Sequence, residues 1–135
     1  EDSLHRDILE EHARSPSHRA SLDQPTGESV WKSPKTGNAC SLTISVSDIG
    51  IDAIQATVEG SALAVACASL MGAAVESLSE AEALALAHSV IAFLERGKEV
   101  ALPGDLVVYE SIVRFPERHD CAMLAWRALV VALES

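Results

Sequence analysis

The feature that most constrains this chain is an almost wholly apolar run near its middle. Between residues 62 and 75 every residue is apolar except Ser69 and Gly72. The run is shorter than the roughly 20 apolar residues of a membrane-spanning helix, and its Ala, Leu and Met content favours helix over strand. A helix that is apolar on every side is surrounded by the rest of its domain. We therefore predict a central buried helix over residues 62–76, with Ser61 as its N-cap.

The hydrophobic pattern on either side of this run predicts an α+β domain. Residues 40–47 alternate apolar and polar, as half-buried strands do. Asp48-Ile49-Gly50 then forms a hairpin loop to a return strand over 51–58, and a short strand near 29–32 precedes both. Amphipathic spacing, capping residues and Pro or Gly breaks predict further helices at residues 2–14, 79–96, 105–113 and 121–133, although residues 106–109 are also compatible with a strand. These elements predict a small antiparallel sheet with helices packed on one face.

The charge balance limits the classes of partner. The chain of 135 residues has ten Lys and Arg against twenty Asp and Glu, a formal charge of −10, and its basic residues are scattered. Nucleic-acid binding is therefore not expected, because contacts to phosphates need clustered basic residues. We find neither a membrane-spanning segment nor a targeting signal, although the chain starts at Glu1 without Met. The expectation is a single domain over residues 1–135, located in the cytoplasm.

The cysteines and histidines are the candidates for chemistry. Cys40, Cys67 and Cys121 are odd in number and form no C-x-x-C pair, which favours free thiols in a reducing compartment. Cys40 lies on the inward face of its strand and Cys67 inside the central helix, so both are expected in the core. Cys121 follows Asp120, a good N-cap, at the start of the last expected helix, where a thiolate is stabilised. A reactive Cys121 and a structural one are equally compatible with this position.

The helical histidines have two interpretations. His5 and His12 lie about two turns apart on the first expected helix, so they are either metal ligands or solvated, half-buried side chains. The second interpretation is favoured. His88 lies on the expected inward face of the helix that ends before Gly97, and we predict a hydrogen-bonded core residue there rather than a metal ligand.

Three stretches of the sequence form a recognisable set. They read L-H-R-D-I-L-E-E-H-A-R-S-P at residues 4–16, V-E-G-S-A-L-A-V-A-C-A-S-L-M at 58–71 and F-P-E-R-H-D-C-A-M-L-A-W-R-A-L at 115–129. Together they resemble SufU-like members of the IscU/NifU-type iron–sulfur cluster assembly family, and the spacer between Lys98 and Phe115 is what separates SufU-like from shorter IscU-like members. The resemblance implies a three-stranded antiparallel sheet flanked by helices. It also implies a scaffold or sulfur-accepting partner of a cysteine desulfurase.

The same resemblance implies a site in which three thiolates and a carboxylate hold zinc or a nascent iron–sulfur cluster. In this chain Thr36 stands in the place of the first cysteine, Asn38 in that of the aspartate and Leu63 in that of the second cysteine. Cys121 remains as the candidate sulfur acceptor, and Cys121 with Asp120 are the candidate metal ligands. One thiolate with a hydroxyl, an amide and a leucine does not make a tetrahedral site. We therefore do not expect bound zinc or a bound cluster.

Several functions stay open at this point. In the first, Cys121 accepts sulfur from a cysteine desulfurase and the metal site is incomplete. In the second, a degenerate family member keeps the fold as an interaction module that regulates a desulfurase or pairs with an active paralogue. A shifted site of Cys67, Cys121 and His119 is a less favoured variant, with Cys67 one turn, about 5.4 Å, beyond residue 63. An independent enzyme is least supported, because no known catalytic motif occurs.

Overall fold

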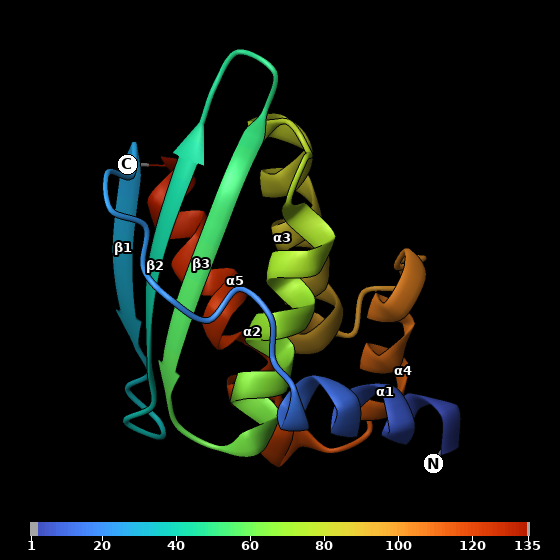
Figure 1. The fold of residues 1–135 in the computed structure, drawn as a ribbon. Coiled ribbons are helices and arrows are strands. Elements are labelled where there is room, and N and C mark those ends of the chain that lie inside the picture. Colours follow the sequence, from blue (N-terminus) through green and yellow to red (C-terminus); the bar gives the residue numbers. More distant parts are fainter. Residues whose placement is uncertain (1–2, 135) are drawn as a thin grey trace.

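The computed structural model describes residues 3–134, which form a three-stranded sheet covered by helices (Figure 1). The elements in order are α1 (Ser3–Arg14), β1 (Gly27–Lys32), β2 (Ala39–Val46), β3 (Ile51–Glu59), α2 (Ala62–Val75), α3 (Glu80–Arg96), the short 3-10 helix η1 (Gly104–Val108), α4 (Tyr109–Ile112), the 3-10 turn η2 (Pro116–Arg118) and α5 (His119–Glu134). This arrangement confirms the expected α+β fold with a three-stranded antiparallel sheet. No helix among the described residues is long and apolar enough to cross a membrane.

The sheet follows the period-two pattern of the sequence. The strands pair antiparallel in the order β1-β2-β3, and Cys40, Leu42 and Ile44 on alternate positions of β2 are buried. Gly50 ends the hairpin loop with a φ of 146°. A Cβ atom at this position would lie 2.5 Å from the carbonyl oxygen of Leu78. Only glycine therefore lets the β2–β3 hairpin approach the turn between α2 and α3 this closely.

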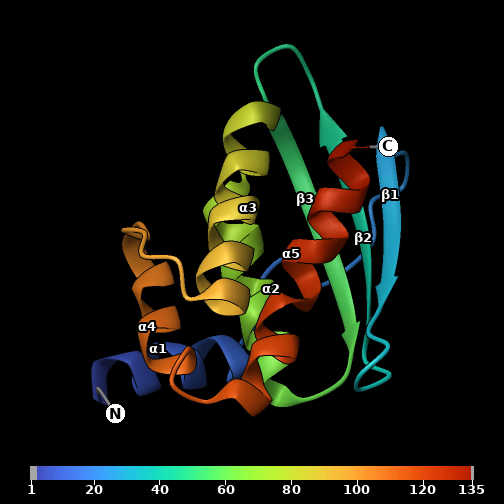
Figure 2. The same cartoon turned by 180° about the vertical axis from the view of Figure 1, so that it is seen from behind.

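Helices cover one face of the sheet, and the chain between α1 and β1 crosses the other face (Figures 1 and 2). On the helical face, α5 packs on β1 and β2 while α2 packs on β3. On the other face the backbone N–H of Leu22 donates to the Thr43 hydroxyl at 3.0 Å. The same segment covers the free edge of β3, because the His18 carbonyl accepts the Ala56 N–H at 2.7 Å. The side chain of His18 fits against α2 only because residue 72 is glycine.

The central helix is buried as its composition predicts. Within α2, Ala62 and Ala73 are the exposed residues, and the others are buried or half-buried. The hydroxyl of Ser61 accepts the N–H of Ala64 at 3.2 Å, so Ser61 is the N-cap. Packing on every side explains why this helix tolerates an all-apolar sequence.

The helix α3 confirms its predicted ends but not its predicted inward face. A capping box starts it and Gly97, in the left-handed region, ends it. The core face uses Ala83, Ala87 and Val90, all with no exposed surface. The prediction for His88 is wrong: its side chain is 55% exposed and its Nε2 lies 3.4 Å from a carboxylate oxygen of Glu134. His88 is one position past Ala87, which rotates it about 100° away from the stripe that meets the core.

The histidines of α1 attach this helix to the rest of the fold. His5 is buried and its Nδ1 lies 2.7 Å from the hydroxyl of Ser111, so it is more deeply placed than the favoured interpretation expects. His12 is half-buried, with its Nδ1 2.7 Å from the hydroxyl of Ser69 on α2. Both side chains therefore act here as hydrogen-bonding contacts between helices.

Candidate functional site

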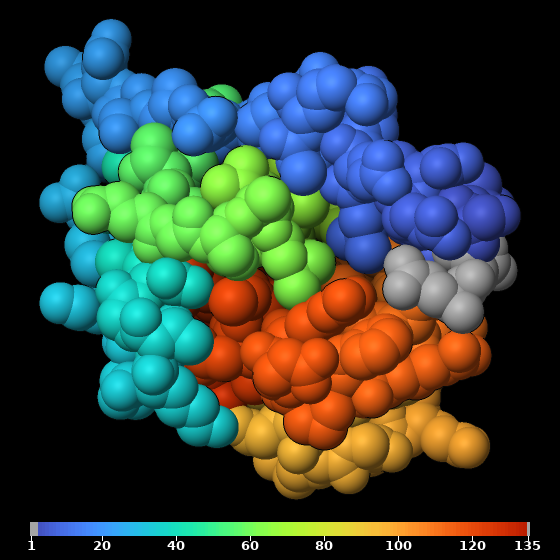
Figure 3. Space-filling view, turned by 90° about the horizontal axis from the view of Figure 1, so that it is seen from below, coloured from blue at the N-terminus to red at the C-terminus, as the bar shows by residue number. Residues whose placement is uncertain are grey.

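Three segments that are distant in the sequence meet at one end of the molecule. Figure 3 views this end directly and shows the β1–β2 loop, the start of α2 and the start of α5 side by side. These segments contain Thr36 and Asn38, Leu63, and Asp120 and Cys121, respectively. The fold therefore gathers the five positions that the resemblance singled out.

The β1–β2 loop is held in a tight turn by its first residue, Ser33. The N–H of Ser33 donates to the carbonyl of Asn38 at 2.8 Å, and the N–H of Gly37 donates to the carbonyl of Ser33 at 2.9 Å. The buried hydroxyl of Ser33 accepts the N–H groups of Lys35 at 3.1 Å and Thr36 at 3.2 Å. The positions of Thr36 and Asn38 are thus fixed by the loop's own backbone.

Asp120 links this loop to α5. Its Oδ2 accepts the hydroxyl of Ser33 at 2.6 Å and that of Thr36 at 3.1 Å. The expected N-cap role is wrong: α5 starts at His119, directly after η2, so Asp120 lies inside the first helical turn. The helix N-terminus still favours its negative charge there. Ser33 received no role in the sequence analysis, and only its place at the start of the S-P-K-T-G turn signals one.

Cys121 lies in the same first turn and is half-buried. Its Sγ accepts a hydrogen bond from the Nδ2 of Asn38 at 3.5 Å. The neighbouring His119 contacts the Val113 carbonyl through Nε2 at 2.8 Å, so this nitrogen carries the proton and is not free to bind a metal. The amide of Asn38 thus points a donor at the one sulfur of the site.

The other two cysteines are core residues. Cys40 and Cys67 have no exposed surface, and burial raises the pKa of each thiol to about 12. For Cys67, a hydrogen bond with the Tyr109 hydroxyl lowers the pKa against that trend, and proximity to Cys121 raises it. The Tyr109 hydroxyl in turn accepts the indole N–H of Trp126 at 2.8 Å. Cys67 is therefore a neutral thiol in the core, which argues against the shifted metal site.

The donor set at these tips does not fit zinc or an iron–sulfur cluster. The Thr36 hydroxyl and the Asn38 amide donate their hydrogens to Asp120 and Cys121, and Leu63 packs against the hydrophobic core. Within residues 3–134, no three His, Cys, Asp or Glu side chains are grouped so that they could hold a metal ion. Zinc needs four nitrogen, sulfur or carboxylate ligands in a structural site, or three and a water in a catalytic one.

The NifU-like N terminal domain family model matches residues 4–135. The chain belongs to this family. Its relatives include the iron–sulfur cluster assembly scaffold protein IscU of Streptococcus pyogenes, 29% identical over 134 residues, or 97% of this chain and 83% of the relative. The zinc-dependent sulfurtransferase SufU of Bacillus subtilis is 26% identical over 132 residues, or 95% of this chain and 88% of the relative. The crystal structure of FiSufU, from the SUF system of Fervidobacterium islandicum, shares the fold, with a TM-score of 0.85, 18% identity and 94% coverage of both chains.

Membership of the NifU-like family confirms the resemblance seen in the sequence. The protein is a SufU/IscU-like member of the iron–sulfur cluster assembly family that lacks most of the expected metal ligands. Hydrogen bonds among Ser33, Thr36, Asn38, Asp120 and Cys121 join the β1–β2 loop to α5.

Proposed function

We propose that this protein accepts sulfur from a cysteine desulfurase on Cys121, without a resident zinc ion. The observation that carries the proposal is the difference among its thiols. Cys121 is half-exposed at the start of a helix on the end of the molecule where the three tips meet, whereas Cys40 and Cys67 are fully buried. A helix N-terminus favours the thiolate, which is the nucleophilic form. The family relationship supplies the partner class.

The chemical step is a thiol–persulfide exchange. The Cys121 thiolate attacks the terminal sulfur of a persulfide on the desulfurase cysteine, so that one S–S bond forms on Cys121 as the S–S bond of the donor breaks. The electron pair of the broken bond leaves with the desulfurase thiolate, and no external oxidant is needed. Asn38 donates a hydrogen bond to the reacting sulfur. The nearby carboxylate of Asp120 opposes a negative sulfur, and its bonds to Ser33 and Thr36 reduce that effect.

Intact mass measurement tests this step directly. The protein is mixed with a purified cysteine desulfurase and L-cysteine without reducing agent, and it is expected to gain the mass of one sulfur atom. Peptide mapping should place the sulfur on Cys121. The Cys121→Ser variant should gain none, whereas the matched control Cys67→Ala should behave as the unaltered protein. Absence of a gain, or an equal gain in Cys121→Ser, would contradict the proposal.

A second function is favoured by the closed hydrogen-bond network at the tips. Because Thr36 and Asn38 already donate to Asp120 and Cys121, this end forms a rigid surface without an open ligand position. In this function the protein binds a desulfurase, or an active paralogue, as a non-metal regulatory module. The two functions separate in the Cys121→Ser variant: sulfur transfer requires Cys121, whereas a binding module keeps its affinity for the desulfurase and its effect on desulfurase turnover.

A further inference from the structure

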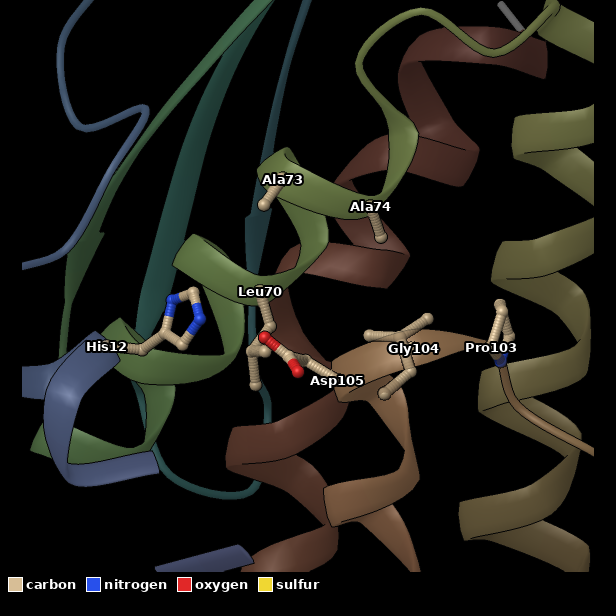
Figure 4. A pocket seen from close by; sticks show the side chains of 8 residues that line it. His12, Leu70, Ala73, Ala74, Pro103, Gly104 and Asp105 are labelled. Carbon is tan, nitrogen blue, oxygen red and sulfur yellow. The ribbon is translucent and has the colours of Figure 1, made fainter. Parts of the chain in front are cut away.

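A cleft of about 320 Å³ lies between α1, the last turns of α2 and η1 (Figure 4). Its size and mixed lining match the lower end of the range for small-molecule sites. It is lined by the apolar side chains of Leu70, Ala73, Ala74, Pro103 and Leu106, together with Gly104 and the polar side chains of His12 and Asp105. Ala73 is ten residues after Leu63 on α2, about 15 Å along the helix, so the cleft is distinct from the end that contains Cys121.

The two polar side chains of the cleft are the half-buried His12 and the exposed Asp105. Figure 4 shows the imidazole of His12 and the carboxylate of Asp105 both near Leu70. Within residues 3–134, the Asp105 carboxylate makes no hydrogen bond or ion pair, and no Lys or Arg lines the cleft. An unpaired carboxylate beside an apolar surface is a binding group for a cation.

A chain of hydrogen bonds connects His12, at the cleft, to Ser69, Ser17, His18 and Glu76. The Glu76 carboxylate only accepts, so His18 Nε2, 3.2 Å away, carries a proton. In the tautomer with that single proton, the Nδ1 of His18 accepts the Ser17 hydroxyl at 2.7 Å. The Ser17 oxygen therefore accepts the Ser69 hydroxyl at 3.2 Å. The Ser69 oxygen then accepts the Nδ1–H of His12 at 2.7 Å. It also accepts the backbone N–H of Ser17 at 2.9 Å. In this arrangement the Nδ1 of His12 is the donor, and the Nε2 of that tautomer is an acceptor.

The backbone adds to the negative potential of the cleft. Ala73 and Ala74 lie in the last turn of α2, where the unpaired carbonyl groups carry partial negative charge and favour cations. This turn contains no basic residue. The net charge of the chain, −10, acts in the same direction. The cleft therefore offers side-chain acceptors and negative potential next to an apolar wall.

We propose that this cleft binds a small aliphatic ammonium ion. The ammonium group has three hydrogen-bond donors and no acceptor. It contacts the carboxylate of Asp105 and the Nε2 of His12, while its hydrocarbon part packs on Leu70, Ala73 and Leu106. This chemistry is found in free aliphatic amines and in the lysine side chain. The proposal goes beyond sulfur transfer and does not depend on Cys121.

Titration with n-butylammonium, followed in two-dimensional amide NMR spectra, tests the proposal. Saturable shifts are expected at Ala73, Ala74 and Leu106. Neutral n-butanol, of the same length, should bind roughly tenfold more weakly, because it forms no charge-assisted hydrogen bond with Asp105. Equal affinity for the alcohol, or no saturable shift with the ammonium ion, would overturn the proposal. A parallel titration with lysine blocked at both backbone ends identifies the source: its binding indicates a partner's lysine and its exclusion a free amine.

Two charge-removing variants distinguish binding in the cleft from non-specific attraction to the net negative charge of the chain. Asp105→Asn should weaken butylammonium binding roughly tenfold. Glu110→Gln removes the same charge from an exposed residue of α4 outside the cleft, and should change affinity less than about twofold. Ala73→Leu, at an exposed position, should fill the cleft and abolish binding without disturbing the core. An equal loss in Glu110→Gln and Asp105→Asn would reduce the effect to non-specific attraction and sink the proposal.

Discussion

The two ends of α2 differ in how their polar side chains are satisfied. At the N-terminal end, the side chains of the β1–β2 loop and α5 bond to one another, and Asp120 accepts two hydroxyl groups. At the C-terminal end, the carboxylate of Asp105 borders a cleft and has no partner among the described residues. The positions at which the resemblance expects ligands thus lie at the N-terminal end of α2, where the side chains bond to one another, and the unpaired carboxylate of Asp105 lies at the C-terminal end. The polar side chains of Thr36 and Asn38 are not vacant there, because they donate to Asp120 and Cys121.

The largest expected effect comes from introducing metal ligands at the N-terminal end of α2, beside Cys121. Thr36→Cys, Asn38→Asp and Leu63→Cys together would place two thiolates and a carboxylate beside Cys121. We expect one zinc ion per chain by elemental analysis. Zinc bound with a free energy of roughly 10 kcal/mol should give a marked, chelator-sensitive rise in melting temperature. The same triple variant with Cys121→Ser is the control and should bind zinc far more weakly. Failure to bind would show that the three tips are not close enough to share one ion.

An intermediate effect is expected from the two buried thiols, Cys40 and Cys67, at alkaline pH. Because the pKa of Cys40 and Cys67 is raised to about 12, the folded chain keeps protons that the unfolded chain releases at lower pH. Their contribution is complete below the unfolded thiol pKa of about 8.5 and is lost as pH rises toward the folded value. Each thiol should lower the free energy of unfolding by about 1.4 kcal/mol per pH unit in that window.

Urea denaturation curves recorded from about pH 8 to about pH 11 measure this loss in the free energy of unfolding. The range starts near the pKa of cysteine in an unfolded chain, roughly 8.5. Cys67→Ala should remove the share of this pH dependence that one buried thiol contributes. Tyr109 contributes in the same direction, because its burial also raises the pKa of its hydroxyl. If the free energy of unfolding fell with pH equally steeply in Cys67→Ala and in the unaltered protein, that result would contradict the burial of this thiol.

The smallest effect compares one carboxylate from each end of α2. Asp120→Asn should lower the free energy of unfolding by about 1–2 kcal/mol, because it weakens two hydrogen bonds and removes a favourable charge at the start of α5. Asp105→Asn should change it by less than about 0.5 kcal/mol, because no partner is lost. Urea denaturation of the two variants gives the difference. If both variants lost the same free energy of unfolding, the two ends of α2 would not differ in how their carboxylates are bonded.

Much of the fold could be predicted because its signals are local. The apolar run from 62 to 75, the alternation in β2 and the capping box at Ser79 each specify an element from neighbouring residues. His88 shows the limit of this approach: a helical pattern allows several similar stripes, and the neighbour packed on α3 selects which one is buried. Small alanines on that stripe carry a weak signal, so sequence periodicity placed His88 on the wrong side.

The residues of the candidate site could be predicted from the sequence, but the hydrogen bonds among them could not. The resemblance located Thr36, Asn38, Leu63, Asp120 and Cys121, which the fold brings to one end. The bond between the Ser33 hydroxyl and the Asp120 carboxylate joins residues 87 positions apart, so no local pattern reveals it. The same holds for the contact between His12 and Ser69, which orients the imidazole at the cleft. Such pairings follow from tertiary packing alone.

The backbone contact between His18 and Ala56 has a consequence for self-association. A strand with unpaired N–H and C=O groups at its margin is a template for a second chain, and proteins cover such margins to prevent cross-pairing. On β3 the segment after α1 occupies Ala56, and the turn after α2 occupies Ile51. Detachment of the N-terminal segment would therefore uncover a site for intermolecular β-pairing, so the first step toward insoluble assemblies is expected at this strand.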